Sequence, residues 1–516
     1  MSINQNDIIY FILTDRFQRP KEYERKTDDP KAYHGGNFCG IIERIPYLKN
    51  LGITALWITP VYLQILEKVT PTDENYRNSG YGYHGYWTLD FNRVDPHLYK
   101  DKPGRETGAK LYLKDLVDEL HKNGIKLILD VVVNHAGYGH PGVTNSPANP
   151  TPIRSDWFNA KAPRTGEDDQ IKNPLAGLPD FNLDSPNVID YHIDTIISWI
   201  RETGIDGIRM DTAKHVERNF WNYYKTQIQG FFPDVSLIGE VYCYENDYSK
   251  DLENIPELGK YQQLWAFDSL FDLPMTRTIE ETLVKGKSLA LFVSPFNQKT
   301  GILERDTNYT NHNKLVTLLD NHDLPQRFFT FLLDNVNQEK EKAIMLFKLS
   351  LSLLFTFRGI PQIYYGTELC MQGRKDPDNR GDFPWDMIGP DNHVKDNYPD
   401  EKEVYEHLKK LIQIRKENTS LTSGSFVCLY VDQTKLVFLR YFENNVIIVA
   451  INNDWVDMSN SFSIEINENS MIPDRIKTIV NNGHLRCLHS GQKITPSGGR
   501  IQIQLSKKMA RIFLCE

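Results

Sequence analysis

The stretch LYLKDLVDELHKNGIKLILDVVV, residues 111–133, decides the fold. Its first part, 111–124, has the apolar pattern of an amphipathic helix, and its last residue, Gly124, closes the pattern as a C-cap would. Its second part, 126–133, is a short apolar run of strand length. A helix that leads into a buried strand is one step of a βαβ unit, so the stretch predicts a parallel sheet covered by helices.

The same alternation runs through the first 370 residues. A second amphipathic helix is predicted over 188–204, and it also closes on a glycine, Gly204. Seven further apolar runs have the length of strands: 8–13, 53–61, 204–210, 235–241, 264–271, 315–320 and 360–366. Eight strands that alternate with helices predict an α/β fold, a closed (β/α)₈ barrel of the TIM type, with a doubly wound open sheet as the alternative.

Two parts of the chain depart from this alternation. After residue 134 about 50 residues are rich in Pro, Gly and Asn, which predicts a small irregular subdomain inserted after strand 3. From about residue 420, TKLVFLRYF and NVIIVAINN flank the hairpin signal ENN, and no helical period is recognised. We therefore expect a barrel over 1–134 and 186–418, a subdomain over 135–185, and an antiparallel β-sandwich over 419–516.

Composition and charge exclude several classes of protein. The 516 residues are 40% hydrophobic and 25% charged, as in globular proteins, and the net charge of −9 comes with no basic run that would favour nucleic acid or an anionic membrane. No stretch approaches the roughly 18 apolar residues of a transmembrane helix, and the first residues lack the pattern of a signal peptide. Six scattered cysteines fit a reduced protein. We expect a cytoplasmic monomer, or a secreted protein if a leader has been removed.

Charged and amide side chains gather where the predicted strands end. Functional residues of a (β/α)₈ barrel lie at the carboxyl ends of its strands. Those ends carry Asn134 and His135, Arg209 and Asp211, Glu240, and the run Asn321, His322 and Asp323. Three carboxylates from three strands suit glycoside hydrolysis, in which one carboxylate attacks and a second, protonated one acts as the acid. A buried structural ion pair is the alternative reading.

The neighbours of these carboxylates suggest different protonation states. Arg209 and Asp211 are two residues apart and share one face of a strand, so the guanidinium would favour the ionised form that a nucleophile needs. Glu240 would lie near two other carboxylates, which oppose its ionisation, and it could therefore hold a proton.

Seven motifs carry a family resemblance. They are DVVVNH (130–135), GIRMDTAKH (207–215), GEVY (239–242), LLDNHD (318–323), LPDFN (178–182), HGGNFCGI (34–41) and GIPQIYYGTE (359–368). In this order they resemble the motifs of the α-amylase family of glycoside hydrolases, family 13, over nearly the full length of the chain. The tyrosines of GIPQIYYG are expected in the barrel core.

The resemblance implies a role for each matching residue. Asp211 would be the nucleophile, Glu240 the acid/base, and Asp323 a stabiliser of the transition state. In YHGYW (83–87), His84 would hydrogen-bond the sugar and Tyr86 would stack on it, with Trp87 beside them. The other implied substrate contacts are His135, Arg209, Lys214, His322, Asp376 and Arg380.

The resemblance also implies one structural calcium ion between barrel and subdomain. Its ligands would be the side chains of Asn134 and Asp180 and the backbone carbonyl of His215, an oxygen-only set that suits a hard cation. No second ion is expected, because TDRFQRPKEY (14–23) lacks the Asp/Asn cluster of some relatives and Asn37 replaces their aspartate.

Several members of the family remain possible. The first is an α-amylase, a retaining endo-hydrolase of α-1,4-glucosidic bonds in soluble starch, glycogen or maltodextrins. The second group comprises maltogenic amylase, cyclomaltodextrinase and cyclodextrin glucanotransferase, and the third is an inactive binding homologue. Leu175 and Ala176 stand where cyclising transferases usually carry a bulky aromatic residue, the first strand begins too early for the extra N-terminal domain of cyclomaltodextrinases, and all three carboxylates are present. The sequence therefore favours the α-amylase.

Overall fold

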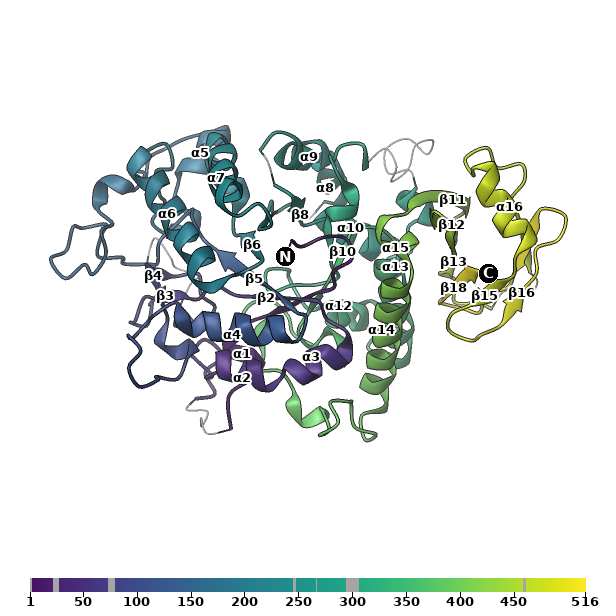
Figure 1. The fold of residues 1–516 in the computed structure, drawn as a ribbon, viewed down its shortest axis with the longest axis horizontal. Coiled ribbons are helices and arrows are strands. Elements are labelled where there is room, and N and C mark those ends of the chain that lie inside the picture. Colours follow the sequence, from purple (N-terminus) through teal and green to yellow (C-terminus); the bar gives the residue numbers. More distant parts are fainter. Residues whose placement is uncertain are drawn as a thin grey trace.

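The computed structural model describes residues 2–21, 27–72, 79–244, 247–265, 267–293, 306–457 and 461–516. Each of the eight predicted apolar runs contains a strand of one parallel sheet (Figure 1). These strands are β1 (Ile9–Ile12), β2 (Ala55–Ile58), β5 (Lys126–Val131), β6 (Gly207–Met210), β7 (Ser236–Gly239), β8 (Ser269–Leu270), β9 (Val316–Thr317) and β10 (Ile360–Tyr364).

The sheet closes on itself. Its order is β8-β7-β6-β5-β2-β1-β10-β9, and a parallel bridge between Phe271 and Val316 joins the two ends. In the middle of this order β1 pairs with both β2 and β10, so that Ile9 lies opposite Ala55 on one side and Gln362 on the other. The prediction of a closed barrel is thereby confirmed over the open sheet.

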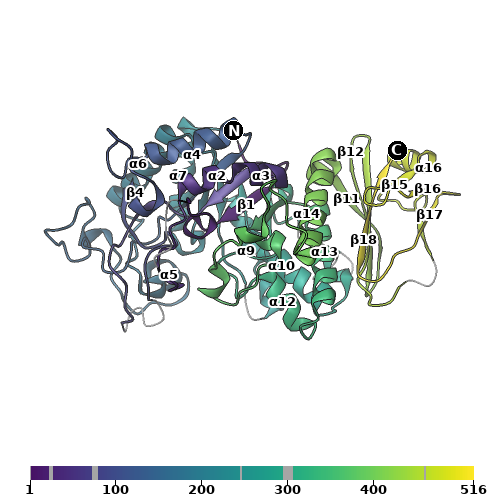
Figure 2. The same ribbon diagram turned by 90° about the horizontal axis from the view of Figure 1, so that it is seen from below.

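Helices surround the barrel (Figures 1 and 2). The glycines predicted to close two of them, Gly124 and Gly204, both have left-handed backbone angles, with φ of 72° and 76°. The helices of the barrel are α1 (Thr14–Phe17), α2 (Phe38–Glu43), α3 (Ile45–Leu51), α4 (Leu111–Lys122), α6 (Pro186–Thr203), α7 (Arg218–Phe231), α8 (Tyr248–Glu253), α9 (Ile255–Gln263), α10 (Leu273–Ile279), α12 (Phe328–Asn335), α13 (Lys340–Thr356) and α14 (Pro399–Glu417).

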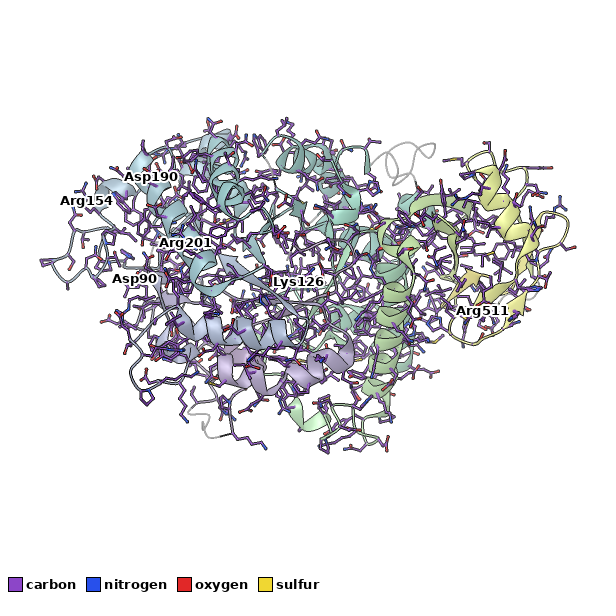
Figure 3. All side chains as sticks on the ribbon, viewed as in Figure 1. Asp90, Lys126, Arg154, Asp190, Arg201 and Arg511 are labelled. Atoms are coloured by element: carbon purple, nitrogen blue, oxygen red, sulfur yellow. The ribbon has the colours of Figure 1, made fainter. Side chains whose placement is uncertain are left out.

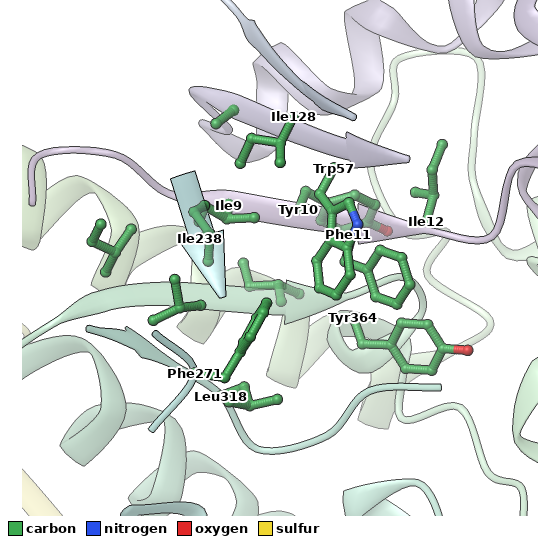
Figure 4. Close-up of a cluster of buried hydrophobic side chains, with 14 of the residues drawn as sticks. Ile9, Tyr10, Phe11, Ile12, Trp57, Ile128, Ile238, Phe271, Leu318 and Tyr364 are labelled. Carbon is green, nitrogen blue, oxygen red and sulfur yellow. The ribbon is translucent and has the colours of Figure 1, made fainter. Parts of the chain in front are cut away.

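Aromatic rings fill the interior of the barrel below the strand ends (Figure 4). The ring of Phe11 stacks on Trp57 with centroids 3.6 Å apart and on Tyr364 at 5.2 Å. Tyr364 and Tyr365 are fully buried, which confirms the prediction that they belong to the core. These packed rings form a rigid floor beneath the polar side chains described below.

The segment after β5 is irregular, as expected from its composition. It contains the helix α5 (Gly166–Lys172) and short 3₁₀ turns, and a bridge between His135 and Asp180 brings its two ends together. Beside it lies an antiparallel pair, β3 (Tyr62–Gln64) and β4 (Thr88–Val94), which the sequence did not predict. The pairing joins segments far apart in the chain and shifts register twice, so no short-range turn signal marks it.

The C-terminal domain is antiparallel β structure that lies beside α13 and α14 of the barrel (Figures 1 and 2). Six of its strands form one sheet in the order β11-β12-β13-β18-β15-β16, and β14 pairs with β17. Their bounds are β11 (Ser425–Val431), β12 (Lys435–Phe442), β13 (Asn445–Asn452), β14 (Phe462–Glu465), β15 (Leu485–Cys487), β16 (Lys493–Ile494), β17 (Arg500–Ile503) and β18 (Met509–Cys515).

The expectation that this domain has no helix was wrong. It contains α16 (Asp474–Asn482), preceded at its junction with the barrel by the single turn α15 (Thr419–Ser423). Ile476 and Val480 of α16 are buried, one helical turn apart, against the β core. One apolar pair in nine residues is too weak a helical signal to be distinguished from the alternating strand pattern on either side.

Two predictions from composition can be compared with the described residues. The structure describes all six cysteines, and none of them is joined in a disulfide bond. Within the ranges given above, no helix is both long enough and apolar enough to cross a membrane.

Candidate active site

A pocket of about 370 Å³ opens at the carboxyl ends of the barrel strands. Most of the predicted site residues line it: His84, Tyr86, Trp87, His135, Asp211, Lys214, His215, Glu240, Asp323, Asp376 and Arg380. Arg209 and His322 lie beneath the lining and contact it, whereas Asn134 and Asp180 are buried beside it. The fold thus brings together residues that are up to 296 positions apart, from His84 to Arg380.

Arg209, near the end of β6, joins the acidic residues of the pocket. Its Nη1 donates to Asp211 Oδ1 at 2.8 Å and to Asp130 Oδ1 at 2.9 Å. Its Nη2 lies 2.6 Å from Glu240 Oε1 and 3.9 Å from Asp323 Oδ2. The side chain is 1% exposed, so Asp130, Asp211 and Glu240 share one desolvated cation, with Asp323 at the edge of ion-pair distance.

Glu240 follows β7, where its backbone N–H donates to Met210 O. Burial raises the pKa of Glu240 to about 8, against the opposing effect of Arg209, and the charges of Asp211 and Asp323 add to the rise. Its Oε2 accepts a hydrogen bond from the backbone N–H of Thr212 at 3.1 Å. The raised pKa favours the protonated form of this carboxyl group near neutral pH, and the contacts with Arg209 and Thr212 fix its orientation.

Asp211 leaves the end of β6 beside Glu240. Its backbone N–H donates to Val131 O, and its Oδ2 accepts from the hydroxyl of Thr212 at 3.1 Å. Thr212 has a left-handed φ of 48°, which turns the chain sharply after the strand. Arg209 and Thr212 therefore hold the two oxygens of Asp211 separately, and the carboxylate faces the pocket in one orientation.

Asp323 follows β9, and contacts with neighbouring residues fix the orientation of its carboxylate. Asn321 Oδ1 accepts from the backbone N–H groups of Asp323 and Leu324, both at 2.9 Å, and so forms the turn that exposes the carboxylate. Its oxygens lie 3.2 Å from His322 Nε2 and 3.2 Å from Arg380 Nη2. With 30% of its side chain exposed, Asp323 is the most accessible of the three predicted carboxylates.

Rings form one wall of the pocket. Tyr86 lies nearly parallel to His84 and His322, with centroids 5.6 and 5.5 Å away, and its hydroxyl contacts His322 Nε2 and Asp130 Oδ2, both at 2.8 Å. Burial lowers the pKa of His84 and that of His322, so both imidazoles are neutral. Trp87 packs with Tyr138 in a small apolar cluster at the rim.

The remaining predicted contacts lie around this wall. His135 Nε2 contacts the carbonyl of Tyr86 at 3.2 Å, and Lys214 Nζ donates to the carbonyl of Tyr242 at 3.3 Å. Asp376 is half exposed and lies 3.4 Å from Arg380 Nη1. Arg380 itself is buried, so the pair is anchored in the pocket rather than being a solvated surface contact.

The sequence interpretation missed several residues of the site. Asp130 is fully buried within β5, accepts from Arg209, Tyr86 and Trp57, and burial raises its pKa to about 7. A lone aspartate in the apolar run KLILDVVV was the signal that could have revealed it. The other lining residues not predicted as contacts are Tyr138, Leu175, Ala176, Leu178, Thr212 and Tyr242.

Two of the residues implied as calcium ligands, Asn134 and Asp180, lie at the start and near the end of the inserted segment, whereas the third, His215, follows β6 and contacts the segment through Gln170 O at 2.9 Å. Asn134 O accepts from Phe181 N at 2.8 Å, and the Asn134 and Asp180 side chains are both 2% exposed. Asp180 accepts from Asn159 Nδ2, and burial, with Glu217 nearby, raises its pKa to about 8. A buried carboxyl group whose surroundings oppose its ionisation fits a site for a hard cation, which would supply the missing positive charge. The described residues hold no cluster of three or more His, Cys, Asp or Glu that could bind a metal by themselves.

The closed barrel, with acidic side chains gathered round one arginine at its strand ends, defines the class of glycoside hydrolases that use paired carboxylates. A model of the alpha amylase catalytic domain matches residues 11–387, and the chain belongs to the α-amylase family of glycoside hydrolases.

Relatives in this family carry several activities. The chain is 29% identical over 98% of its length to a beta/alpha-amylase of Paenibacillus polymyxa, of which it spans only 37%. It is 31% identical over 86% of its length to a cyclomaltodextrinase of Thermoanaerobacter pseudethanolicus, covering 70% of that protein. Among solved structures, it matches an alpha-amylase from Geobacillus thermoleovorans complexed with acarbose, with a TM-score of 0.78, 30% identity, and coverage of 100% of this chain and 99% of the other.

Proposed function

We propose that the protein is a retaining α-amylase that hydrolyses internal α-1,4-glucosidic bonds of soluble starch, glycogen or maltodextrins. The observation that carries the proposal is the position of Asp211 and Glu240. They extend from adjoining strands, share Arg209, and have Thr212 between them, which binds one oxygen of each. Asp211 faces the pocket as a hydrogen-bond acceptor, and the raised pKa of Glu240 favours its protonated form. Double displacement requires this combination of a nucleophile and an acid.

In the first step, an oxygen of Asp211 attacks the anomeric carbon of the sugar. The bond from that carbon to the leaving glycosidic oxygen breaks, and Glu240 gives its proton to this oxygen. Arg209 then interacts with a Glu240 that has become negative, which offsets the charge that develops on the acid. The product is a glycosyl ester on Asp211 and a free non-reducing chain end.

In the second step, Glu240 takes a proton from water and the water oxygen attacks the anomeric carbon. The ester bond to Asp211 breaks, which restores both carboxyl groups and releases the sugar with its original anomeric configuration. Asp323 and Arg380 lie where sugar hydroxyls would be bound, and the stacked ring of Tyr86 offers a flat apolar face to a pyranose.

Two observations favour an α-glucan and an amylase over the other activities. The alpha-amylase relative that covers the whole chain is complexed with acarbose, and the family model spans the barrel. The rim carries Leu175 and Ala176 at the position where a cyclising transferase is expected to have a bulky aromatic residue. Cyclomaltodextrinase is the second candidate, because such an enzyme is similar over 86% of the chain.

One bound calcium ion is part of the proposal. The side chains of Asn134 and Asp180 and the carbonyl of His215 would hold it, and its charge would fix the inserted segment against the barrel. No step of the hydrolysis passes through the ion.

The test is a time course of products from linear amylose, with the anomeric form of new chain ends followed by proton NMR. We expect a spread of oligosaccharides at low conversion, released as α-anomers. A single short product from the start, or faster turnover of cyclic dextrins than of amylose, would favour the second candidate. Release of β-anomers would contradict the retaining mechanism.

A further inference from the structure

A second cavity, of about 300 Å³, lies between the barrel and the C-terminal domain. It is bordered by α13 and α14 on one side, and by the β15–β16 loop and the start of β18 on the other. Its lining residues are Met345, Lys348, Leu349, Ser352, His407, Cys487, His489, Ser490, Lys507, Lys508, Met509, Ala510 and Arg511. Of these, Arg511 is labelled on the C-terminal domain in Figure 3.

The lining is cationic although the whole chain carries a net charge of −9. It contains three lysines and an arginine and no aspartate or glutamate. Lys348 is paired with Glu403, at 2.6 Å. In the described parts of the chain, no ion pair joins Lys507, Lys508 or Arg511 to a carboxylate. Two acidic residues outside the lining lie close by, because the charge of Asp454 acts on Lys508 and Asp457 Oδ1 accepts from the backbone N–H of Lys507 at 2.8 Å.

Two of these cations have neutral contacts. Lys508 is 8% exposed and donates to Asn453 Oδ1 at 2.8 Å, and burial lowers its pKa to about 8. Arg511 Nη1 donates to Gln492 Oε1 at 2.8 Å, which leaves most of the guanidinium N–H groups for another acceptor. The charge of Asp454 only partly offsets the burial of Lys508, and a desolvated cation that lacks an ion pair is stabilised when an anion binds beside it.

Polar and apolar groups of the cavity are arranged for a larger molecule than a simple ion. His489 stacks on His407 with centroids 5.5 Å apart, and His407 is held by the carbonyl of Lys348 at 3.1 Å. Apolar side chains come from both borders of the cavity, with Met345 and Leu349 on α13 and Met509 and Ala510 on β18. Lysine, arginine, imidazole and serine groups in one lining match the several oxygens of a phosphate group, while the apolar side chains suit an organic substituent.

We infer that this cavity binds an organic phosphate monoester, with the phosphate held by Lys507, Arg511 and His489 and the organic group packed against Met345, Leu349 and Met509. Such a ligand would contact the barrel and the C-terminal domain at once. Its binding would therefore stabilise the interface between them.

The experiment is isothermal titration of the full chain with phenyl phosphate, inorganic phosphate and phenol, at constant ionic strength in a zwitterionic buffer. We expect one saturable site for phenyl phosphate, about tenfold tighter than that for inorganic phosphate, and no binding of phenol. The melting temperature should rise with phenyl phosphate. Equal affinity for phenyl phosphate and inorganic phosphate, or no binding of either, would overturn the inference.

Variants locate the binding. The double variant Lys507→Gln/Arg511→Gln should bind phenyl phosphate at least about tenfold more weakly, since two charge-assisted contacts are lost. The control is Lys493→Gln, a lysine of the same domain that does not line the cavity, and it should bind as the unchanged protein does. An equal loss in both would mean diffuse attraction rather than a site. Unchanged amylose hydrolysis by the variants would show that they fold, because neither residue lines the active site.

Discussion

Nη2 of Arg209 lies 2.6 Å from Oε1 of Glu240, while Nη1 of the same guanidinium lies 2.8 Å from Oδ1 of Asp211. One rigid planar group therefore spaces the proposed acid and the proposed nucleophile. It also carries the only nearby positive charge among the described contacts of either carboxylate. The relative position of the two proposed catalytic groups depends on a residue that does not line the pocket.

Glu240→Gln should lower kcat on amylose by about 10²–10⁴-fold, the usual contribution of a general acid, and Asp211→Asn should lower it further because the attacking oxygen is lost. Steady-state kinetics with thermal melting would measure both. Glu368→Gln is the control, since Glu368 is equally buried but is held by Tyr10 and Tyr47 away from the pocket. Near-normal turnover by either site variant would refute the assignment.

Arg209→Lys should reduce kcat by about 10²-fold with a smaller effect on KM, because lysine keeps the charge but cannot space two carboxylates in one plane. It should also destabilise the protein, but by less than the roughly 3–5 kcal/mol that follows removal of one partner of a buried ion pair, because the positive charge is kept. Arg277→Lys serves as control. Arg277 is paired with Asp251 and Glu280 outside the pocket, so this variant should lose stability while kcat stays the same. A similar loss of kcat in both variants would mean that Arg209 acts only through stability.

Stability should fall as pH rises from about 4.5 to above 8. The pKa of Glu240 is raised to about 8 in the folded protein, so its contribution is present below the unfolded pKa and is lost as pH rises through the folded one. Glu240→Gln should reduce the difference in unfolding free energy between pH 5 and pH 9 by roughly 2–4 kcal/mol, since each tenfold change in proton affinity corresponds to about 1.4 kcal/mol. Denaturant titrations would measure it, with the exposed Glu257→Gln as control. For wild type, kcat/KM should also fall above about pH 8, where Glu240 loses its proton.

Chelation should lower the melting temperature, and calcium should restore it. Calcium at a hundredfold excess over its Kd adds about 2.7 kcal/mol of stability. Asp180→Asn should abolish the calcium-dependent shift, whereas Asp184→Asn, at an exposed neighbouring position paired with Lys172, should keep it. Metal analysis of the dialysed protein should give one ion per chain. A melting temperature that ignores both chelator and calcium would contradict the proposed ion.

Ala176→Tyr should raise the ratio of transfer to hydrolysis, since a ring at the pocket rim would retain the glucan and exclude water. Ala176 has a left-handed φ of 53°, and its carbonyl accepts from Tyr138 at 2.8 Å, so the position faces the pocket in a fixed loop. Ala176→Gly should leave the product ratio alone and stabilise the protein by up to about 1 kcal/mol, because glycine relieves the backbone conformation. Chromatography of products would distinguish the two. If Ala176→Tyr leaves the ratio of transfer to hydrolysis unchanged, residue 176 at the pocket rim does not determine this specificity.

Much of the fold could be predicted because each barrel strand is a local apolar run. The eight runs marked the strands independently of how they pair, and Gly124 and Gly204 marked helix ends by their own backbone preference. The β3–β4 pair and α16 were missed because their signals are not local: one depends on an irregular long-range register, the other on a single buried turn.

The candidate site divides in the same way. Asp211, Glu240 and Asp323 follow strands, so their convergence could be predicted from the barrel alone. Asp130 was missed because it lies inside a strand and its role depends on contact with Arg209 from the next one. The burial of Arg380, likewise, depends on contacts with His322 and Asp323 that no spacing in the sequence specifies.

The pairing of β1 with β10 has a consequence for the chain as it is being made. Ile9 finds its partner Gln362 only after the intervening residues have left the ribosome. At a synthesis rate of roughly 5–20 residues per second, one edge of β1 stays without its hydrogen-bonding partner for roughly 20–70 s. During that time the apolar strand is open to pairing with other nascent chains. The yield of folded enzyme in a cell therefore depends on what shields this first strand until the barrel can close.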